Sequence, residues 1–168
     1  RRSNSVFFPE PSVGPGGRLK TPRKAVGEAE IIVHGRASHA GLAPEEGINA
    51  IHELTHQISR ITKWNDPQCG TTANVDIVEG GTRTNVIADR ARAVVDLRAT
   101  RAADVRDIER HLHALKPHAP GARLDVRGVF SRPPLQPKLP SALLTIATSL
   151  AHQLNLPLRQ PAAGARYS

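Results

Sequence analysis

His39 lies in the segment Gly-Arg-Ala-Ser-His-Ala-Gly at residues 35–41, directly after the short apolar run 31–33. Small neighbours leave the imidazole open to close approach, and loops on a rigid scaffold often carry functional residues. An imidazole can donate or accept a hydrogen bond near neutral pH. Taken alone, the segment favours an ordinary exposed histidine in a turn. Its meaning therefore depends on the residues that accompany it.

A second candidate is the sequence His-Glu-Leu-Thr-His at residues 52–56, which matches the His-Glu-x-x-His signature of zinc proteases. In that signature two imidazoles one helical turn apart bind zinc, and the glutamate, here Glu53, acts as general base. The apolar face of the predicted helix centres near Ile58, which places His52 and His56 on the polar side. A zinc site needs a sheltered cavity, and no third histidine follows at the expected spacing. A zinc protease therefore remains a minor alternative to two solvent-facing histidines.

The elements that must hold these residues follow from the periodicity of the apolar side chains. The predicted strands are 28–34, 71–79, 86–98 and 123–130, and the predicted helices are 47–63, 102–116 and 141–154. Gly80 and Gly81 begin the turn of a hairpin between the second and third of these strands. Proline-rich linkers precede the first strand and follow the fourth.

Between the linkers the predicted order is β-α-β-β-α-β. With right-handed crossovers, this order gives a four-stranded antiparallel sheet with two helices on one face, the ferredoxin-like fold of the α+β class. We expect three segments, at residues 1–24, 25–135 and 136–168. Both linkers leave the middle module at the same end, so we interpret it as a module inserted into another domain.

The composition limits the classes of partner. The formal net charge is +8, but the arginines are scattered and only 3% of the residues are aromatic. Nucleic-acid binding is not expected, because it uses clustered cations and stacking aromatic rings. The single cysteine, Cys69, rules out an internal disulfide and fits a reducing, cytoplasmic location. No apolar run has membrane-spanning length, so no membrane partner is expected.

Five separated motifs occur in a fixed order along the chain. They are Gly-Arg-Ala-Ser-His-Ala-Gly at 35–41, Pro-Glu-x-Gly-x-Asn-Ala at 44–50, Gly-Gly-Thr-Arg-Thr-Asn-Val at 80–86, Asp-Leu-Arg at 96–98 and Arg-Pro at 132–133. Together they resemble the dinuclear-zinc peptidase and deacylase family of bacterial glutamate carboxypeptidase, acetylornithine deacetylase, succinyl-diaminopimelate desuccinylase and aminoacylase. The resemblance runs through that family's lid, or dimerisation, domain. It implies that the flanks are parts of an α/β catalytic domain, the second ending after its first helix.

The resemblance implies a role for five residues. His39 matches the lid histidine that reaches the active site of the partner subunit and donates a hydrogen bond to the developing oxyanion. Asn85 matches an asparagine that holds substrate, and Arg132 matches the arginine that binds the substrate's carboxylate. Arg98 matches a further lid arginine whose role is less defined. Glu10 matches a carboxylate that binds one of two zinc ions.

The directions of the predicted strands indicate at which end of the sheet each candidate residue lies. The loop with His39 and the hairpin with Asn85 follow strands that lead away from the linkers, whereas Arg132 lies at the linker end. Arg132 could therefore serve its own chain's active site, while His39 and Asn85 need a partner's, which predicts a two-fold homodimer. On local sequence alone, Asn85 also fits a turn former, and Arg132 fits a surface arginine before proline.

The departures from the family pattern lead to two hypotheses. The family's other zinc ligands and its catalytic glutamate have no counterparts in this sequence, and one carboxylate cannot hold two zinc ions. The first hypothesis is a fragment of a zinc-dependent amidohydrolase that cleaves N-acyl amino acids or peptides with a free carboxylate, with this chain inactive alone. The second is a non-catalytic dimerisation or binding module.

Overall fold

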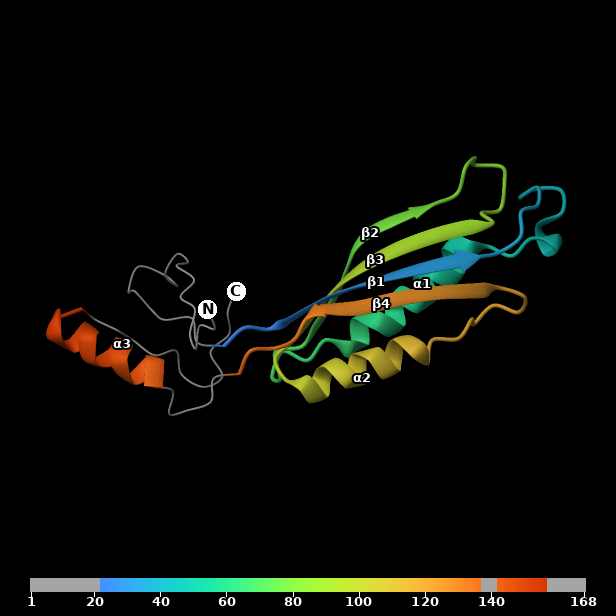
Figure 1. Cartoon of the computed structure of the whole chain (residues 1–168). Helices are drawn as coiled ribbons and strands as arrows, with labels where there is room; N and C mark the ends of the chain where they lie inside the picture. Colours follow the sequence, from blue (N-terminus) through green and yellow to red (C-terminus); the bar gives the residue numbers. More distant parts are fainter. Residues whose placement is uncertain (1–21, 137–141, 157–168) are drawn as a thin grey trace, which may run out of the picture. The chain divides into compact units, whose positions relative to one another are not determined.

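The computed structural model describes residues 22–136 and 142–156, which fall into two units (Figure 1). The unit Lys24–Leu135 contains β1 (Ala25–His34), α1 (Ala50–Ile61), β2 (Thr72–Gly80), β3 (Arg90–Ala99), α2 (Ala102–His113) and β4 (Arg123–Arg132). It also has two short 3-10 turns, η1 (Pro44–Glu46) and η2 (Thr62–Trp64). The other unit contains α3 (Ala142–Gln153). None of the described helices is long and apolar enough to cross a membrane.

The four strands form one antiparallel sheet in the order β2-β3-β1-β4. Both α1 and α2 pack on the same face of this sheet (Figure 1). The predicted ferredoxin-like α+β fold is therefore confirmed. Its two edge strands are β2 and β4, and β2 carries a bulge between Val75 and Ile77.

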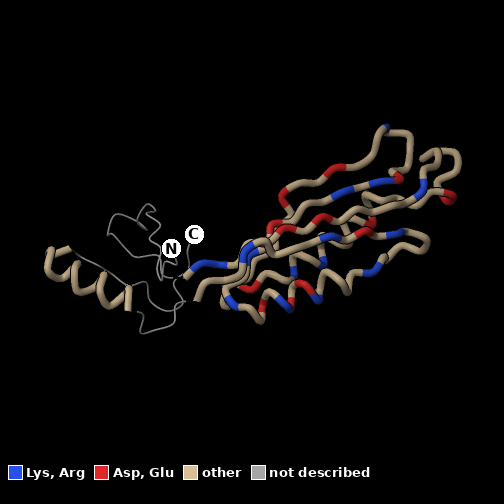
Figure 2. Tube along the Cα trace, viewed as in Figure 1, with Lys and Arg blue, Asp and Glu red and all other residues tan. Residues whose placement is uncertain are grey.

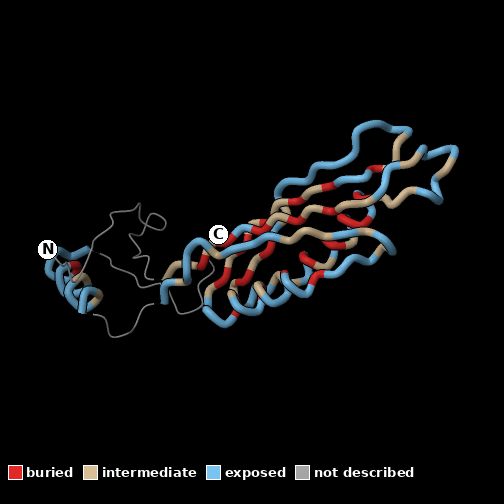
Figure 3. The backbone as a smooth tube through the Cα atoms, turned by 45° about the vertical axis from the view of Figure 1, so that its right-hand side comes forward, coloured by how far each residue is buried: buried red, intermediate tan, exposed pale blue. Residues whose placement is uncertain are grey.

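The helix-covered face of the sheet is aliphatic, and many of its side chains are small. Alternate residues of β1 and β3 are fully buried there, as Figure 3 shows for the strand interiors. The largest apolar side chains that are less than 2% exposed in this core are Ile31, Val33, Leu54, Ile61, Val95 and Leu97. Alanines fill much of the remaining strand surface, which lets the helices lie close to the sheet.

The opposite face of the sheet is polar and carries paired charges. Figure 2 shows basic and acidic residues interspersed along the strands. Arg92 on β3 donates to Glu30 on β1 at 2.5 Å and to Glu79 on β2 at 3.3 Å. His34 and Asp125 pair across β1 and β4 at 2.8 Å between Nε2 and Oδ2. The hydrogen bond from Arg92 holds the pKa of the Glu30 carboxyl below its usual range.

Several element boundaries differ from the sequence prediction by one to four residues, and two of these differences have a cause visible in the hydrogen bonds. The first helix begins at Ala50 rather than residue 47, because Asn49 caps it: its Oδ1 accepts from the amides of Ile51 and His52 at 3.0 and 3.2 Å. The third strand begins at Arg90 rather than residue 86. Residues 86–88 bond to the 35–50 segment instead of continuing the ladder with β2.

Candidate functional site

The loop that carries His39 is closed at its base by a backbone pair. The Arg36 amide donates to the Ile48 carbonyl at 3.0 Å, and the Ile48 amide donates to the Arg36 carbonyl at 2.9 Å. Gly35 lies directly against this pair. A Cβ at position 35 would lie 2.0 Å from the Ile48 carbonyl oxygen, so only glycine fits there. The base of the loop therefore depends on this close backbone approach.

The tip of the same loop is joined to the β2–β3 connection. The Ala40 amide donates to the Asn85 carbonyl at 2.9 Å, and the Ile87 amide donates to the Ser38 carbonyl at 3.0 Å. His39 itself forms an isolated bridge with Val86. Both connections lie at the same end of the sheet (Figure 1). The structure thus brings together His39 and Asn85, which are far apart in the sequence.

The imidazole of His39 has a defined tautomer when it is neutral. Its Nδ1 lies 3.1 Å from the Gly41 amide nitrogen and 3.2 Å from that of Leu42. Backbone amides only donate, so Nδ1 must be the acceptor, and the proton of the neutral ring is on Nε2. The side chain is exposed, and Nε2 has no hydrogen-bond partner within the described residues. The loop therefore presents an outward N–H donor.

Asn85 is a second polar residue at this end of the sheet, and its backbone contacts the His39 loop. The residue is exposed, and its backbone rather than its side chain makes the contact to Ala40. Its side-chain amide makes no hydrogen bond within the described part of the chain, so it can both donate and accept. The backbone contact brings the two residues to the same end of the sheet, and an N–H donor and a carboxamide are both groups that can hold a carbonyl or carboxylate oxygen.

The two arginines predicted to bind substrate lie at the other end of the sheet. Val26 on β1 pairs with Arg98 on β3 and with Arg132 on β4. Arg98 is held by Asp96 through two hydrogen bonds of 2.8 Å, whereas Arg132 is exposed. His34, beside the His39 loop, follows Val26 by eight residues along β1, or roughly 26 Å at about 3.3 Å per residue. One small substrate cannot touch both ends of the same module.

No zinc site is formed by the part of the chain that the structure describes. Within residues 22–136 and 142–156, no group of three or more histidine, cysteine, aspartate or glutamate side chains is placed to hold a metal ion. Glu10, the predicted zinc ligand, lies outside the described residues. The described side chains therefore do not fit a dinuclear zinc centre.

The His-Glu-x-x-His sequence has a different role from the one its signature suggests. Glu53 is 2% exposed, and its carboxylate accepts from the amides of His118 and Ala119, the latter at 2.7 Å, and from Gln57 Nε2 at 2.5 Å. Burial raises the pKa of Glu53, but the hydrogen bonds from Ala119, Gln57 and His118 outweigh it and hold the pKa below its ordinary value. A carboxylate occupied in this way is not available as a general base.

The two histidines of this sequence differ in their surroundings. His52 is exposed as expected. The expectation was wrong for His56, which is half-buried and stacks on the His118 ring with centroids 4.0 Å apart. Ile51, two turns before Ile58 and on the same side of the helix, is 38% exposed, while Glu53 and Gln57 are buried. The physical reason is that the segment around His118 packs on this side of α1 and donates its amides to Glu53.

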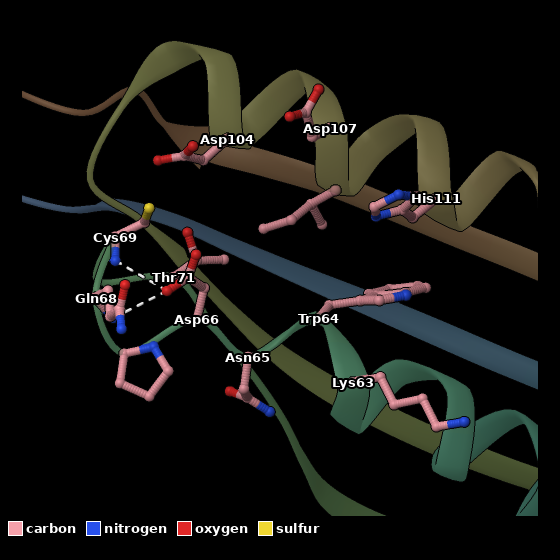
Figure 4. Close-up of a pocket in the computed structure, with 12 residues that line it drawn as sticks. Lys63, Trp64, Asn65, Asp66, Gln68, Cys69, Thr71, Asp104, Asp107 and His111 are labelled. Carbon is pink, nitrogen blue, oxygen red and sulfur yellow. Dashed lines mark hydrogen bonds between the residues drawn. The ribbon is translucent and has the colours of Figure 1, made fainter.

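A pocket of about 470 Å³ opens between the α1–β2 connection and α2 (Figure 4). Trp64 stacks on His111 at its rim, with ring centroids 5.6 Å apart. Asp66 accepts from the amides of Gln68 and Cys69, and its hydrogen bond with the thiol raises the pKa of Cys69. A raised pKa leaves less of the reactive thiolate near neutral pH, so Cys69 is not activated as a nucleophile in this pocket.

A family model and several known proteins match this chain, and they agree on one family. Residues 21–120 match the family model described as the peptidase dimerisation domain. Carboxypeptidase G2 of Pseudomonas sp. (strain RS-16) is 30% identical over 95 residues, which cover 56% of this chain and 23% of that protein. A peptidase M20 domain-containing protein of Schizosaccharomyces pombe is 32% identical over 112 residues, 64% of this chain and 27% of that protein. The chain thus spans about a quarter of the length of these relatives.

Solved structures share the fold. A tripeptidase from Staphylococcus aureus superposes with a TM-score of 0.76 at 22% identity, over 94% of this chain and 42% of that one. An aminopeptidase PepT from Bacillus cereus gives a TM-score of 0.71 at 22% identity, over 92% of this chain and 42% of that one. Each match covers less than half of the solved chain.

Proposed function

The chain belongs to the family of peptidase dimerisation domains, and on that premise we propose that residues 25–135 are the self-associating lid of an amide-bond hydrolase. The observation that supports this most strongly is the separation of the two groups of polar residues. His39 and Asn85 lie together at one end of the sheet, and Arg98 and Arg132 lie at the other. In a two-fold dimer, His39 and Asn85 of one subunit would complete the site that Arg132 of the other subunit serves.

On this proposal, each residue acts through a hydrogen bond or a charge. His39 Nε2–H would donate to the carbonyl oxygen of the scissile amide as negative charge develops on it, because its ring is already held in the donor tautomer by Gly41 and Leu42. Asn85 would hold the substrate beside it. The guanidinium of Arg132 would bind a free carboxylate, which makes N-acyl amino acids or peptides with a free carboxylate the proposed substrate class.

The cleavage machinery itself would belong to a catalytic domain. We propose that residues 1–24 and 136–168 are parts of that domain, as the family resemblance implies. The family resemblance implies two zinc ions there, whereas the described side chains of this chain do not fit such a centre. We also propose that the protein is cytoplasmic.

The edge strand β2 is the surface best suited to self-association. It exposes Ile77 at 47% and Val78 at 56%, and Ile51 of α1, 38% exposed, packs close to Gly80 at the end of the same strand. Open strand edges with apolar side chains pair readily with another chain. The other edge, β4, exposes Arg123, Arg127 and Arg132 beside Val129. Charges of this kind discourage pairing.

Replacing Val78 by aspartate is therefore expected to convert a dimer of the 168-residue chain to a monomer, because the substitution places a charge at an exposed apolar position of this edge. Sedimentation velocity over a range of concentrations measures this change. Val129→Asp is the matched control, since Val129 is 64% exposed on the opposite edge. Monomeric wild-type chain at all concentrations, or equal loss of dimer in both variants, would count against association through β2.

A further inference from the structure

The carboxylate of Glu53 connects α1 to the segment between α2 and β4. It accepts three protein hydrogen-bond donors, the amides of His118 and Ala119 and the side chain of Gln57. Gln57 also donates to the Lys116 carbonyl at 3.1 Å. The residues 116–121 form the support segment. A buried carboxylate with this many donors fixes the backbone that donates to it.

The support segment in turn packs against the base of the His39 loop. Gly121 has a φ of +82° and lies so close to Ile48 that a Cβ there would be 2.8 Å from the Ile48 Cδ1 atom. Ile48 is the residue whose backbone pairs with Arg36 to close the loop. Contacts thus run from Glu53 through the support segment and Ile48 to the loop that carries His39.

We propose that Glu53 is a positioning residue for His39, acting through residues 116–121 and Ile48. The inference rests on the proposed function of His39, but its structural part stands independently. The sequence His-Glu-Leu-Thr-His is then a positioning device rather than a zinc motif. Asn49 at the start of α1 and Glu53 one turn later place two neighbouring loops on the same rigid element.

Both the charge and the length of the Glu53 side chain are needed to hold the support segment. Glutamine has the same shape but offers one acceptor oxygen in place of two, and its NH₂ group would face another donor, either Gln57 Nε2 or the Ala119 amide. Oε2 of Glu53 accepts from both the His118 and the Ala119 amide, so a glutamine oxygen in that place keeps these contacts only as weaker, neutral hydrogen bonds and turns its NH₂ group toward Gln57. In either orientation Glu53→Gln weakens the donors' hold on this carboxyl position, and the support segment should open more often. The opening should pass to the His39 loop, because Ile48 would lose the surface it packs against.

Hydrogen exchange in the 168-residue chain tests this. In Glu53→Gln, the amides of residues 36–42 and 118–119 are expected to exchange at least about tenfold faster, while those of β1 and β3 keep their protection. Asp104→Asn is the matched control, because Asp104 is also buried, at 9% exposure, and pairs with Arg101 at the opposite end of the module. Asp104→Asn should leave the exchange rates of the amides of residues 36–42 unchanged relative to those of the sheet.

A second variant distinguishes the contacts between Glu53 and the support segment from the contact between the support segment and Ile48. Ile48→Ala keeps Glu53 and its donors, so it should loosen residues 36–42 while the His118 and Ala119 amides remain protected. In Glu53→Gln, the ¹⁵N resonance of His39 Nδ1 should also move toward that of an imidazole without backbone donors, a signature that a general loss of stability does not give.

Three results would overturn the inference. These are unchanged exchange at 36–42 in Glu53→Gln, an equal acceleration in Asp104→Asn, and acceleration of the β1 and β3 amides to the same degree as the loop. A different result would contradict the proposed function alone. If the loop loosens as expected but His39 is dispensable for turnover, Glu53 positions a loop that does not take part in catalysis.

Discussion

Replacing His39 by alanine in the whole protein is expected to lower kcat by about 10²–10³-fold, the usual effect of removing one hydrogen-bond donor from a developing oxyanion. The value of kcat/KM should fall by a similar factor, because the interaction forms in the transition state and not with the ground-state amide. The expectation rests on the outward Nε2–H that the Gly41 and Leu42 amides impose on the ring. Steady-state kinetics with a saturable amide substrate measures both parameters.

The matched control is His52→Ala. His52 is an exposed histidine on α1 outside the proposed site, and its loss should leave both parameters unchanged. A rise in KM alone for His39→Ala would show that the residue binds substrate without stabilising the transition state. Unchanged kinetics would remove His39 from the mechanism.

Gly35→Ala is expected to cost the module about 3 kcal/mol or more of its free energy of unfolding, at or beyond the upper end of the usual overpacking range. The added Cβ would lie 2.0 Å from a backbone oxygen, and backbone cannot swing aside as a side chain can. The pair between Arg36 and Ile48 would have to open, and the His39 loop would lose its base. Thermal unfolding should show the melting temperature falling by about 10 °C or more.

Gly41→Ala provides the comparison for this variant. A Cβ at position 41 would meet only the His39 ring, at an ordinary contact distance of 3.7 Å. Its effect on the free energy of unfolding should stay within about 0.5 kcal/mol. Equal destabilisation by the two substitutions would mean that the close approach at Gly35 is not what requires glycine there.

The fold was predictable because the sequence pattern is local and repeated. Period-two alternation in β1 and β3 and the two amphipathic helices determine the β-α-β-β-α-β order, and that order leaves few topologies. Strand direction alone also indicated that the loops of His39 and Asn85 share one end of the sheet. The structure adds the hydrogen bonds that join the two loops.

The role of Glu53 could not be predicted, because it depends on residues 65 positions away. On a helical wheel Glu53 lies on the polar side, with His52 and His56, and so looks solvent-exposed. Nothing local indicates that the amides of His118 and Ala119 come to it. The only sequence signal was a Glu53–Gln57 pair at a spacing of four, next to Leu54. The tautomer of His39 could not be predicted either, because two backbone amides set it and their direction depends on the conformation of the turn.

The measurement that tests the account most directly is the activity of mixed dimers of the whole protein. His39→Ala and Arg132→Ala subunits, each nearly inactive alone, are combined at equal amounts. If His39 acts on the partner's site and Arg132 on its own, a mixed dimer has one intact site and one doubly altered site. Random association should then restore about a quarter of wild-type activity. Activity no higher than the mean of the two separate variants would show that both residues serve the same subunit, and would contradict the account.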